Sequence, residues 1–427
     1  MQPLAIAILA GQTPKSIECC FIDERLESIP YDVDADLIAM SVETYSARNA
    51  YQIAERFRAR GVPVVLGGCH PTFLPEEAAM YADSVVVGDA EIIWPQVLQD
   101  FQQGALKSIY RQEELPSLDQ SVVDRRLFEG KRYAPIIPIQ FGRGCRYSCD
   151  FCSIHALYGS TMRQRSPQDV AEEIRELKTQ GRKNFVFTDD NLFNNPEAAK
   201  ELFHAIKPLK IHWSCQVSLD IAQDESLLKL MSESGCDVLV IGFESLDDQN
   251  LQQIRKAANR KQGDYSKAIQ RIYDHHMMIY GTFVIGYDHD RLDSFDSILE
   301  FAVKSKFFLA NFNPLTPTPG TTLYDRLERK GRLLYDRWWL SDEYRYGGAL
   351  FEPKQLSARQ LTEGCYRIRT AFNRYNVILR RALHRKANAS SPRHLGVHLL
   401  ANIISRREIH RKQNLRLGSE SPLKPVQ

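Results

Sequence analysis

Three cysteines lie close together in a polar stretch, and their spacing is suited to holding an inorganic centre. The run reads Arg143-Gly-Cys-Arg-Tyr-Ser-Cys-Asp-Phe-Cys152, so three residues separate Cys145 from Cys149 and two separate Cys149 from Cys152. Soft thiolates select iron–sulfur clusters or zinc. A 4Fe–4S cluster normally takes four cysteines. Three ligands would therefore leave one iron free to bind a substrate or a cofactor.

Two other interpretations of these cysteines have to be weighed. The same thiols could form a zinc site with His155 as the fourth ligand. They could also be buried structural thiols, but Arg146, Asp150 and the neighbouring glycines indicate a polar loop and not a core strand. The iron–sulfur interpretation is favoured. The strands and helices predicted around the cysteine run indicate whether it lies at a binding site.

Short apolar segments alternate with amphipathic ones on both sides of the cysteine run. The segments predicted as strands are 136–141, 184–188, 211–217, 238–243, 278–285 and 308–315. The segments predicted as helices are 167–179, 196–206, 225–234, 266–275 and 294–304. Units of this kind and number predict an α/β fold, an open (β/α)6 relative of the TIM barrel, whose site forms where the strands end.

Polar residues follow three of these predicted strands at their carboxyl ends. They are Asp189 and Asp190 after the second strand, Gln216 and Ser218 at the third, and Gly242 and Glu244 at the fourth. Carboxylates in a partly dry pocket would bind a cation, and a glycine would allow a ligand to approach the backbone. The alternatives are a helix N-cap at Asp189 or Asp190 and a surface position for Glu244.

The first 125 residues have their own alternation of strands and helices. Strands are predicted at 18–22, 36–42, 62–66 and 84–87, and helices at 46–60 and 75–81. Glycines follow two of the strands, at Gly67, Gly68 and Gly88. This pattern predicts a parallel, doubly wound, Rossmann-like sheet with its ligand crevice at the carboxyl ends of the strands. The polar stretch 108–133 is interpreted as a linker.

The cysteine spacing and the strand-end residues together resemble the radical S-adenosylmethionine (radical SAM) superfamily, over about residues 15 to 350. The resemblance implies that Cys145, Cys149 and Cys152 bind a 4Fe–4S cluster whose open iron chelates the methionine part of SAM. It also places Phe151 beside the adenine. Asp189 and Asp190 would replace the turn that binds the methionine ammonium group. The remaining SAM-binding candidates are Gln216, Ser218, Gly242 and Glu244.

The N-terminal stretch resembles the cobalamin-binding domain that precedes many radical SAM cores. The resemblance implies that Gly67, Gly68, Thr72 and Gly88 line the corrin ring or its nucleotide tail. Two departures weaken it: the Asp-x-His-x-x-Gly motif is absent, and the chain starts near the first helix of that domain. Either 4–9 replaces the first strand, or the domain is a shortened relic, or the true start lies upstream. The alternative to cobalamin binding is a structural Rossmann-like cap. His70 could be a metal or cobalt ligand, but because a proline follows it in a strand-end loop, a hydrogen-bonding role is favoured.

Length and composition limit the remaining classes. A chain of 427 residues predicts two or three domains, here about 1–125, 130–330 and a mainly helical, basic part at 331–427. No apolar run approaches the roughly 20 residues that span a bilayer. With no basic leader at the N-terminus we expect a reducing cytosol. The cysteines then expected to be free thiols are Cys19, Cys20, Cys69, Cys215, Cys236 and Cys365.

The C-terminal part is rich in arginine and lysine and is predicted to form helices at 357–386 and 394–412. Basic amphipathic helices favour an anionic surface, either a membrane interface or nucleic acid. The alternative is a solvated helical face that closes the barrel. Relatives that act on hopanoid lipids and porphyrins have a similar tail, so a bulky apolar substrate is expected. Peripheral membrane contact through the basic tail is one prediction beside the solvated face, and nucleic acid is disfavoured.

The resemblance implies an enzyme that cleaves SAM to a 5′-deoxyadenosyl radical, with electrons from a flavodoxin- or ferredoxin-type donor. The function predicted first is cobalamin-dependent methylation of an unactivated carbon on a lipid, a tetrapyrrole or a secondary metabolite. The second is a cobalamin-independent radical SAM isomerisation, elimination or cyclisation. The third, from a different class, is a metal-cluster protein that binds RNA through its basic tail.

Overall fold

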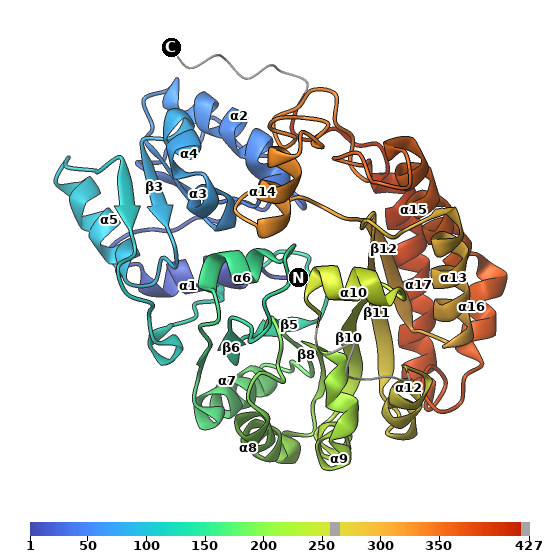
Figure 1. Ribbon diagram of the computed structural model, residues 1–427. Helices are drawn as coiled ribbons and strands as arrows, with labels where there is room; N and C mark the ends of the chain where they lie inside the picture. Colours follow the sequence, from blue (N-terminus) through green and yellow to red (C-terminus); the bar gives the residue numbers. More distant parts are fainter. Residues whose placement is uncertain (257–264, 420–427) are drawn as a thin grey trace.

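A parallel six-stranded sheet forms the centre of the computed structural model, which describes residues 1–256 and 265–419 (Figure 1). Its order is β12-β11-β10-β9-β8-β5, so neighbouring strands follow one another along the chain. The bounds are β5 Ile137–Ile139, β8 Asn184–Phe187, β9 His212–Val217, β10 Cys236–Glu244, β11 Met278–Ile285 and β12 Leu309–Pro314. All six predicted strands and the open-barrel architecture are confirmed.

The outer face of this sheet is covered by helices and the inner face is accessible. The covering helices are α7 Pro167–Thr179, α8 Pro196–Ile206, α9 Glu225–Glu233, α12 Tyr265–Asp274 and α13 Leu292–Lys304. Phe187, Trp213 and Phe283 point outward and are buried beneath them. Along the same strands, Gln216 and Asn313 point to the other face and are exposed. The concave inner face is therefore polar and open near the strand ends, as a binding surface requires.

The N-terminal part is a separate four-stranded parallel sheet of order β1-β2-β3-β4. Its strands are β1 Ile38–Ser41, β2 Val64–Gly67, β3 Ser84–Val87 and β4 Ile109–Arg111. Its helices are α1 Leu4–Gln12, α2 Ala47–Arg58, α3 Cys69–Phe73, α4 Pro75–Tyr81 and α5 Ile93–Gln102. Val64 and Leu66 pack in one cluster with α2 and α4, whereas Val65 packs in another with α5. Both faces are covered, so the doubly wound Rossmann-like prediction is confirmed.

Two local predictions in this part were wrong, and one of the three alternatives for the N-terminus is ruled out. Residues 18–22 are not a strand, and Cys19 and Cys20 are exposed. In the described sheet β1 has a partner only on its β2 side, so residues 18–22 do not pair with its other edge. Residues 4–9 belong to helix α1 and do not replace a strand. The supposed linker contains β4, which pairs with β3.

Helices α14 Thr322–Arg329, α15 Ala358–Phe372, α16 Tyr375–Ala382 and α17 Pro392–Lys412 complete the described chain. The helix predicted over 357–386 is interrupted at Asn373, whose carbonyl accepts a hydrogen bond from Arg406 of α17 at 3.1 Å. Side chains of α15–α17 cap the free edge of β12: Arg369 donates to the Phe312 carbonyl at 2.7 Å and Asn402 to the Phe308 carbonyl at 3.0 Å. These helices therefore close the open side of the barrel. None of the described helices has the length and apolar character needed to cross a bilayer.

Candidate active site

The cysteine loop leaves the end of β5 and is closed at its base by a two-stranded hairpin. Strand β6 Gly142–Arg143 pairs with β7 Arg163–Gln164, and helix α6 Ser153–Tyr158 starts directly after the last cysteine. Gly144 has a φ of +94°, and a Cβ there would lie 2.1 Å from the Thr161 carbonyl oxygen. No other residue fits this turn. The backbone thus fixes how the loop begins.

Two further residues hold the loop in place, and sequence reasoning missed both of these roles. The Asn194 side chain accepts from the Arg146 backbone N–H at 3.1 Å and donates to the Gly144 carbonyl at 2.7 Å. The buried Asp150 carboxylate accepts from the Tyr287 hydroxyl at 2.7 Å and from Arg326 at 2.6 Å. These partners are far apart in the sequence, so no local pattern could have revealed the contacts. They leave the loop little freedom to rearrange.

The thiols themselves sit in a largely dry environment beside a cation. Cys149 is buried, and Cys145 and Cys152 are partly buried. Burial raises the pKa of Cys149 to about 12, although Lys256 opposes the shift. Lys256 lies 3.0 Å from the Glu244 carboxylate. Burial by itself lowers the pKa of Lys256, but Glu244 and Cys149 more than offset this and leave that pKa raised. The charged Lys256 would partly compensate the negative charge of thiolates bound to a metal centre.

The zinc alternative does not fit this geometry. No set of three His, Cys, Asp or Glu side chains within residues 1–256 and 265–419 converges closely enough to hold one metal ion. The proposed fourth ligand, His155, has its Nδ1 3.1 Å from the Gly159 carbonyl at the end of α6. Thiols around a 4Fe–4S cluster bind separate irons and need not converge on one atom. Three thiols on one loop are the kind of ligand that an iron–sulfur cluster takes, and their role as cluster ligands stays a prediction.

Asp189 and Asp190 lie at the strand end, as predicted, and bind backbone around the loop. Asp189 is buried and accepts from the N–H groups of Phe141 at 2.9 Å and Gly142 at 2.5 Å. Burial raises its pKa to about 8. Asp190 is partly exposed and accepts from Gly144 N–H at 2.8 Å. These contacts position the cysteine loop, and a role of either carboxylate toward SAM stays a prediction.

The other predicted SAM-binding residues flank the same strand ends. Gln216 is exposed and donates to the Asp190 carbonyl at 3.0 Å, which brings the second and third strands together. Ser218 is buried, and its N–H donates to the Asn191 side chain at 3.3 Å. Phe151 packs, partly buried, against the barrel core. The structure thus gathers these residues around one strand-end region, where Gln216 is the most accessible.

Gly242 and Glu244 lie at a bulge of β10, where the register shifts between them. Glu244 has a φ of +64°, an unusual conformation for a residue with a side chain. A Cβ at Gly242 would lie 2.0 Å from the Glu244 carboxylate and 3.0 Å from the Lys256 ammonium. The glycine therefore makes room for the Glu244–Lys256 pair beside the cysteines, which is a different reason from the predicted approach of a ligand.

Buried ion pairs connect the N-terminal sheet to the start of the cysteine loop. Arg143 lies 2.8 Å from Asp89 and 2.8 Å from Glu91, both in the segment that follows β3. Arg163 of β7 lies 2.7 Å from Asp89, which also accepts from the Tyr158 hydroxyl at 2.8 Å. Helix α3 lies against α6. These contacts bring the carboxyl ends of β2 and β3 toward the barrel mouth.

The predicted cobalamin-contacting residues meet at that end of the sheet. Thr72 donates to the Gly68 carbonyl at 2.8 Å and accepts from Gly88 N–H at 3.0 Å. Gly67, Gly68, Thr72 and Gly88 are all partly exposed. A Cβ at Gly67 would meet nothing closer than Val86 at 3.7 Å, so the fold itself does not require this glycine. These four residues therefore form a partly exposed surface of small side chains at the strand ends, and their role towards cobalamin stays a prediction.

His70 is buried in a hydrogen-bonding network. This agrees with the prediction that it is a hydrogen-bonding group and not a metal ligand. Its Nε2 lies 3.1 Å from the Tyr51 hydroxyl and 3.2 Å from the Glu77 carboxylate. Glu77 also accepts from the Trp339 indole N–H at 2.9 Å. The network joins the N-terminal sheet to the segment after α14, so His70 has a structural role.

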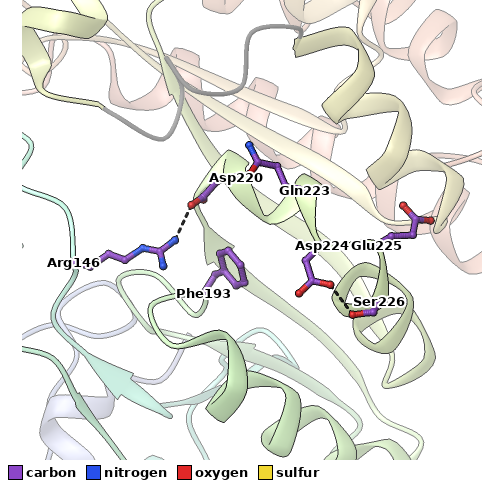
Figure 2. A pocket seen from close by; sticks show the side chains of 7 residues that line it. All are labelled: Arg146, Phe193, Asp220, Gln223, Asp224, Glu225 and Ser226. Atoms are coloured by element: carbon purple, nitrogen blue, oxygen red, sulfur yellow. Dashed lines mark hydrogen bonds and ion pairs between the residues drawn. The ribbon is translucent and has the colours of Figure 1, made fainter.

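An open pocket of about 560 Å³ lies next to Arg146 of the cysteine loop. It is lined by Arg146, Phe193, Asp220, Gln223, Asp224, Glu225 and Ser226 (Figure 2). Arg146 lies 2.7 Å from Asp220 across it. Asp224 accepts from Leu227 N–H and caps helix α9. Its polar residues are thus occupied by contacts within the protein. The residues predicted to bind SAM lie elsewhere.

Comparisons with known proteins agree with this geometry. A radical SAM superfamily profile matches residues 139–302, and a B12 binding domain profile matches residues 1–98. The bacteriochlorophyllide d C-12(1)-methyltransferase of Chlorobaculum tepidum is 32% identical and aligns with 89% of this chain and 84% of its own length. The bacteriochlorophyllide d C-8(2)-methyltransferase of the same organism is 30% identical over 78% of each chain.

The fold also matches a solved structure. The cobalamin-dependent S-adenosylmethionine radical enzyme OxsB, with aqua-cobalamin bound, superposes with a TM-score of 0.62 at 15% identity. The match covers 89% of this chain and 64% of OxsB, so this chain spans just under two thirds of that structure. At this identity the likeness shows the fold alone.

Proposed function

Because the chain belongs to the radical SAM superfamily, in the class that carries a B12 binding domain, we propose that it is a cobalamin-dependent methyltransferase acting on an unactivated carbon of a tetrapyrrole. The observation that carries the proposal is the position of the cysteine loop. It lies at the strand ends of an open barrel, beside the partly exposed glycines of the N-terminal sheet. The substrate class rests on the two bacteriochlorophyllide methyltransferases, each at least 30% identical to this chain.

The residues of this chain provide binding, positioning and charge. Cys145, Cys149 and Cys152 would hold the 4Fe–4S cluster, and Gly67 and Thr72 would contact cobalamin. When bound, the cluster and SAM supply a radical that removes hydrogen from carbon, and cobalamin supplies a methyl group. The Lys256 ammonium lies beside the cysteines to compensate negative charge, paired with Glu244. The concave face of the barrel, with Gln216 and Asn313 exposed, would receive SAM and the substrate.

We further propose a cytoplasmic enzyme that takes a small-molecule or lipid substrate and receives electrons from a flavodoxin- or ferredoxin-type protein. The two rival functions have no support of their own. The cysteines of the described chain do not converge on a single ion. This disfavours the third predicted function, an RNA-binding protein, in the form in which its metal is zinc. A reaction without cobalamin does not need the B12 binding domain that residues 1–98 match.

The proposal is tested on anaerobically purified, iron–sulfur-reconstituted protein given dithionite, SAM, hydroxocobalamin and bacteriochlorophyllide d. We expect S-adenosylhomocysteine, 5′-deoxyadenosine and a methylated pigment together. The variant with Cys145, Cys149 and Cys152 all changed to alanine should lose the cluster absorbance and every product. The matched control changes Cys19, Cys20 and Cys69 to alanine and should retain them.

Each other outcome points to a different function. SAM cleavage with a modified but unmethylated pigment, independent of cobalamin, would favour isomerisation, elimination or cyclisation. Methylation of a hopanoid lipid and not of the pigment would keep the reaction and replace the substrate. Cleavage of SAM by the triple alanine variant would overturn the assignment of the cluster.

A further inference from the structure

Helices α16 and α17 present a cluster of exposed apolar side chains on the outside of the barrel. The exposed fractions are 62% for Tyr375, 58% for Leu379, 79% for Leu383, 62% for Leu400, 37% for Ile403 and 51% for Ile404. Elsewhere in the described chain, exposed large apolar residues are scattered through loops and elements of both domains. Single exposed leucines need no explanation, but a contiguous group on two packed helices does.

The exposed residues form rows on the sides of the helices that do not face the sheet. Tyr375, Leu379 and Leu383 are spaced four residues apart, so they lie in one row along α16. On α17, Leu400 and Ile404 have the same spacing. The two helices are tied together because Arg381 donates to the Asn402 side chain at 2.8 Å. These two rows form one surface, here called the α16–α17 face.

The α16–α17 face is also strongly basic. Between residues 374 and 412, Glu408 is the only acidic residue among many arginines and lysines. Its unpaired cations are Arg374, Arg380, Arg385 and Arg407, all exposed. None of the four forms an ion pair with an acidic residue of the described chain, whereas Arg411 and Lys412 pair with Glu408. Leucine and isoleucine beside free arginines make a surface complementary to a partner that is both apolar and anionic.

The structural role of the C-terminal helices does not use this face. The contacts that close the β12 edge come from the opposite sides of the helices: Arg381 and Asn402 are fully buried and bond the Phe308 carbonyl. The outward leucines and arginines make none of these contacts. Fold stability therefore does not explain why they are apolar and basic.

Two other occupants fit less well. Single-stranded nucleic acid would need aromatic platforms for its bases, but most of these residues are aliphatic, and Tyr375 has Arg406 stacked over its ring at 4.7 Å. A second copy of the chain would bring the same arginines together across a two-fold interface, where like charges repel. An anionic bilayer satisfies both features, because acyl chains receive the leucines and headgroups receive the arginines.

We propose that the α16–α17 face docks the enzyme on the surface of membranes that contain anionic lipids. The barrel then lies on the bilayer through the helices that close it, with the N-terminal sheet on the other side of the barrel (Figure 1). Docking requires no transmembrane segment, only shallow insertion of the leucines. The proposal does not depend on which molecule is methylated, so failure of the tetrapyrrole assignment would leave it standing.

The test is flotation of the full-length protein with vesicles of phosphatidylcholine, alone or mixed with phosphatidylglycerol. We expect binding to the mixed vesicles that weakens as salt is raised, and little binding to the neutral ones. A leucine variant changes Leu379, Leu383 and Leu400 to serine. An arginine variant changes Arg374, Arg380, Arg385 and Arg407 to glutamine. Each should lower the apparent affinity about tenfold or more.

A matched control keeps these effects distinct from general changes in charge and apolar surface. It changes Leu26 and Leu115, exposed by 44% and 42%, to serine and the exposed Arg182 to glutamine. The control should bind vesicles like the unchanged protein, and all variants should keep the same melting temperature. Equal binding to neutral and anionic vesicles would overturn the proposal. Self-association that only the leucine variant loses, without vesicle binding, would show that a second copy covers the face.

Discussion

Arginine has opposite uses in two regions of this molecule. Between the N-terminal sheet and the cysteine loop, Arg143 and Arg163 are each only 12% exposed and pair with Asp89. On the α16–α17 face, Arg380 and Arg407 are exposed and unpaired within the described chain. In the first region the arginines are neutralised by a carboxylate of the protein itself. In the second region their charges remain available to a binding partner.

The comparison shows that neither the number of arginines nor their local sequence reveals their role. A buried cation needs carboxylate or hydrogen-bonding partners, because removing them leaves an uncompensated charge out of water. An exposed cation has no such requirement and contributes little to stability. Substitutions in the two regions should therefore change the unfolding free energy by very different amounts.

Replacing Arg143 with glutamine should have the largest effect. The change leaves Glu91 without this partner and Asp89 with one ion pair, to Arg163, so we expect a loss of about 3–5 kcal/mol in unfolding free energy. Since Arg143 directly precedes the cysteine loop, iron content after reconstitution should fall as well. Urea denaturation and iron analysis measure the two effects. An unchanged stability would show that the interface does not depend on this pairing.

Arg380 and Arg381 are neighbours in the sequence and should behave differently. Arg381 is fully buried and donates to the carbonyls of Phe307 at 2.6 Å, Phe308 at 2.9 Å and Phe372 at 3.1 Å. Arg381→Gln strands buried acceptors, and we expect it to cost about 3 kcal/mol. Arg380→Gln is the matched control and should stay within about 0.5 kcal/mol. Equal losses in thermal or urea unfolding would contradict the assignment of inner and outer sides to α16.

Lowering the pH should reduce the unfolding free energy through His398, which is buried on the inner side of α17. Burial lowers the pKa of His398 to about 4, with the charge of Arg381 adding to the shift, while a bond to the Ile378 carbonyl opposes it. The unfolded chain therefore binds more protons than the folded one between about pH 4 and 6.5, and stability falls as pH is lowered through that window. We expect a loss of about 3 kcal/mol from this group. His398→Gln should reduce the slope of unfolding free energy against pH, and an unchanged slope would be the contrary result.

Much of the fold could be predicted because its signals are local. Each barrel strand is a continuous apolar run that the helices bury, and Ser166 and Asn195 before prolines mark two helix starts that the structure confirms. The segment 18–22 has the same local composition as a strand, but a strand also needs a neighbour, which the sequence does not show. Strand β4 is only three residues long and was hidden in polar surroundings.

The candidate site was predictable at its cysteines and less so around them. Their spacing alone identified the loop, whereas the residues that position it, Asn194, Arg143 and Lys256, act through contacts across long stretches of sequence. Gly242 was expected to admit a ligand, and its space is taken by the Glu244 carboxylate. Which side of a basic helix faces inward also depends on tertiary packing, as Arg380 and Arg381 show.

The smallest effect should come from the outer arginines. Changing Arg374, Arg380, Arg385 and Arg407 to glutamine removes four like charges without breaking an ion pair of the described chain. We therefore expect unfolding free energy to stay the same or to rise by a few tenths of a kcal/mol at low salt, where repulsion is least screened. The matched control is Arg393→Gln on α17, which lies 2.9 Å from Asp237 and should cost up to about 1 kcal/mol. A larger loss of unfolding free energy from the fourfold change than from Arg393→Gln would mean that the outer arginines stabilise the fold itself. Their presence on the α16–α17 face would then be explained without a membrane.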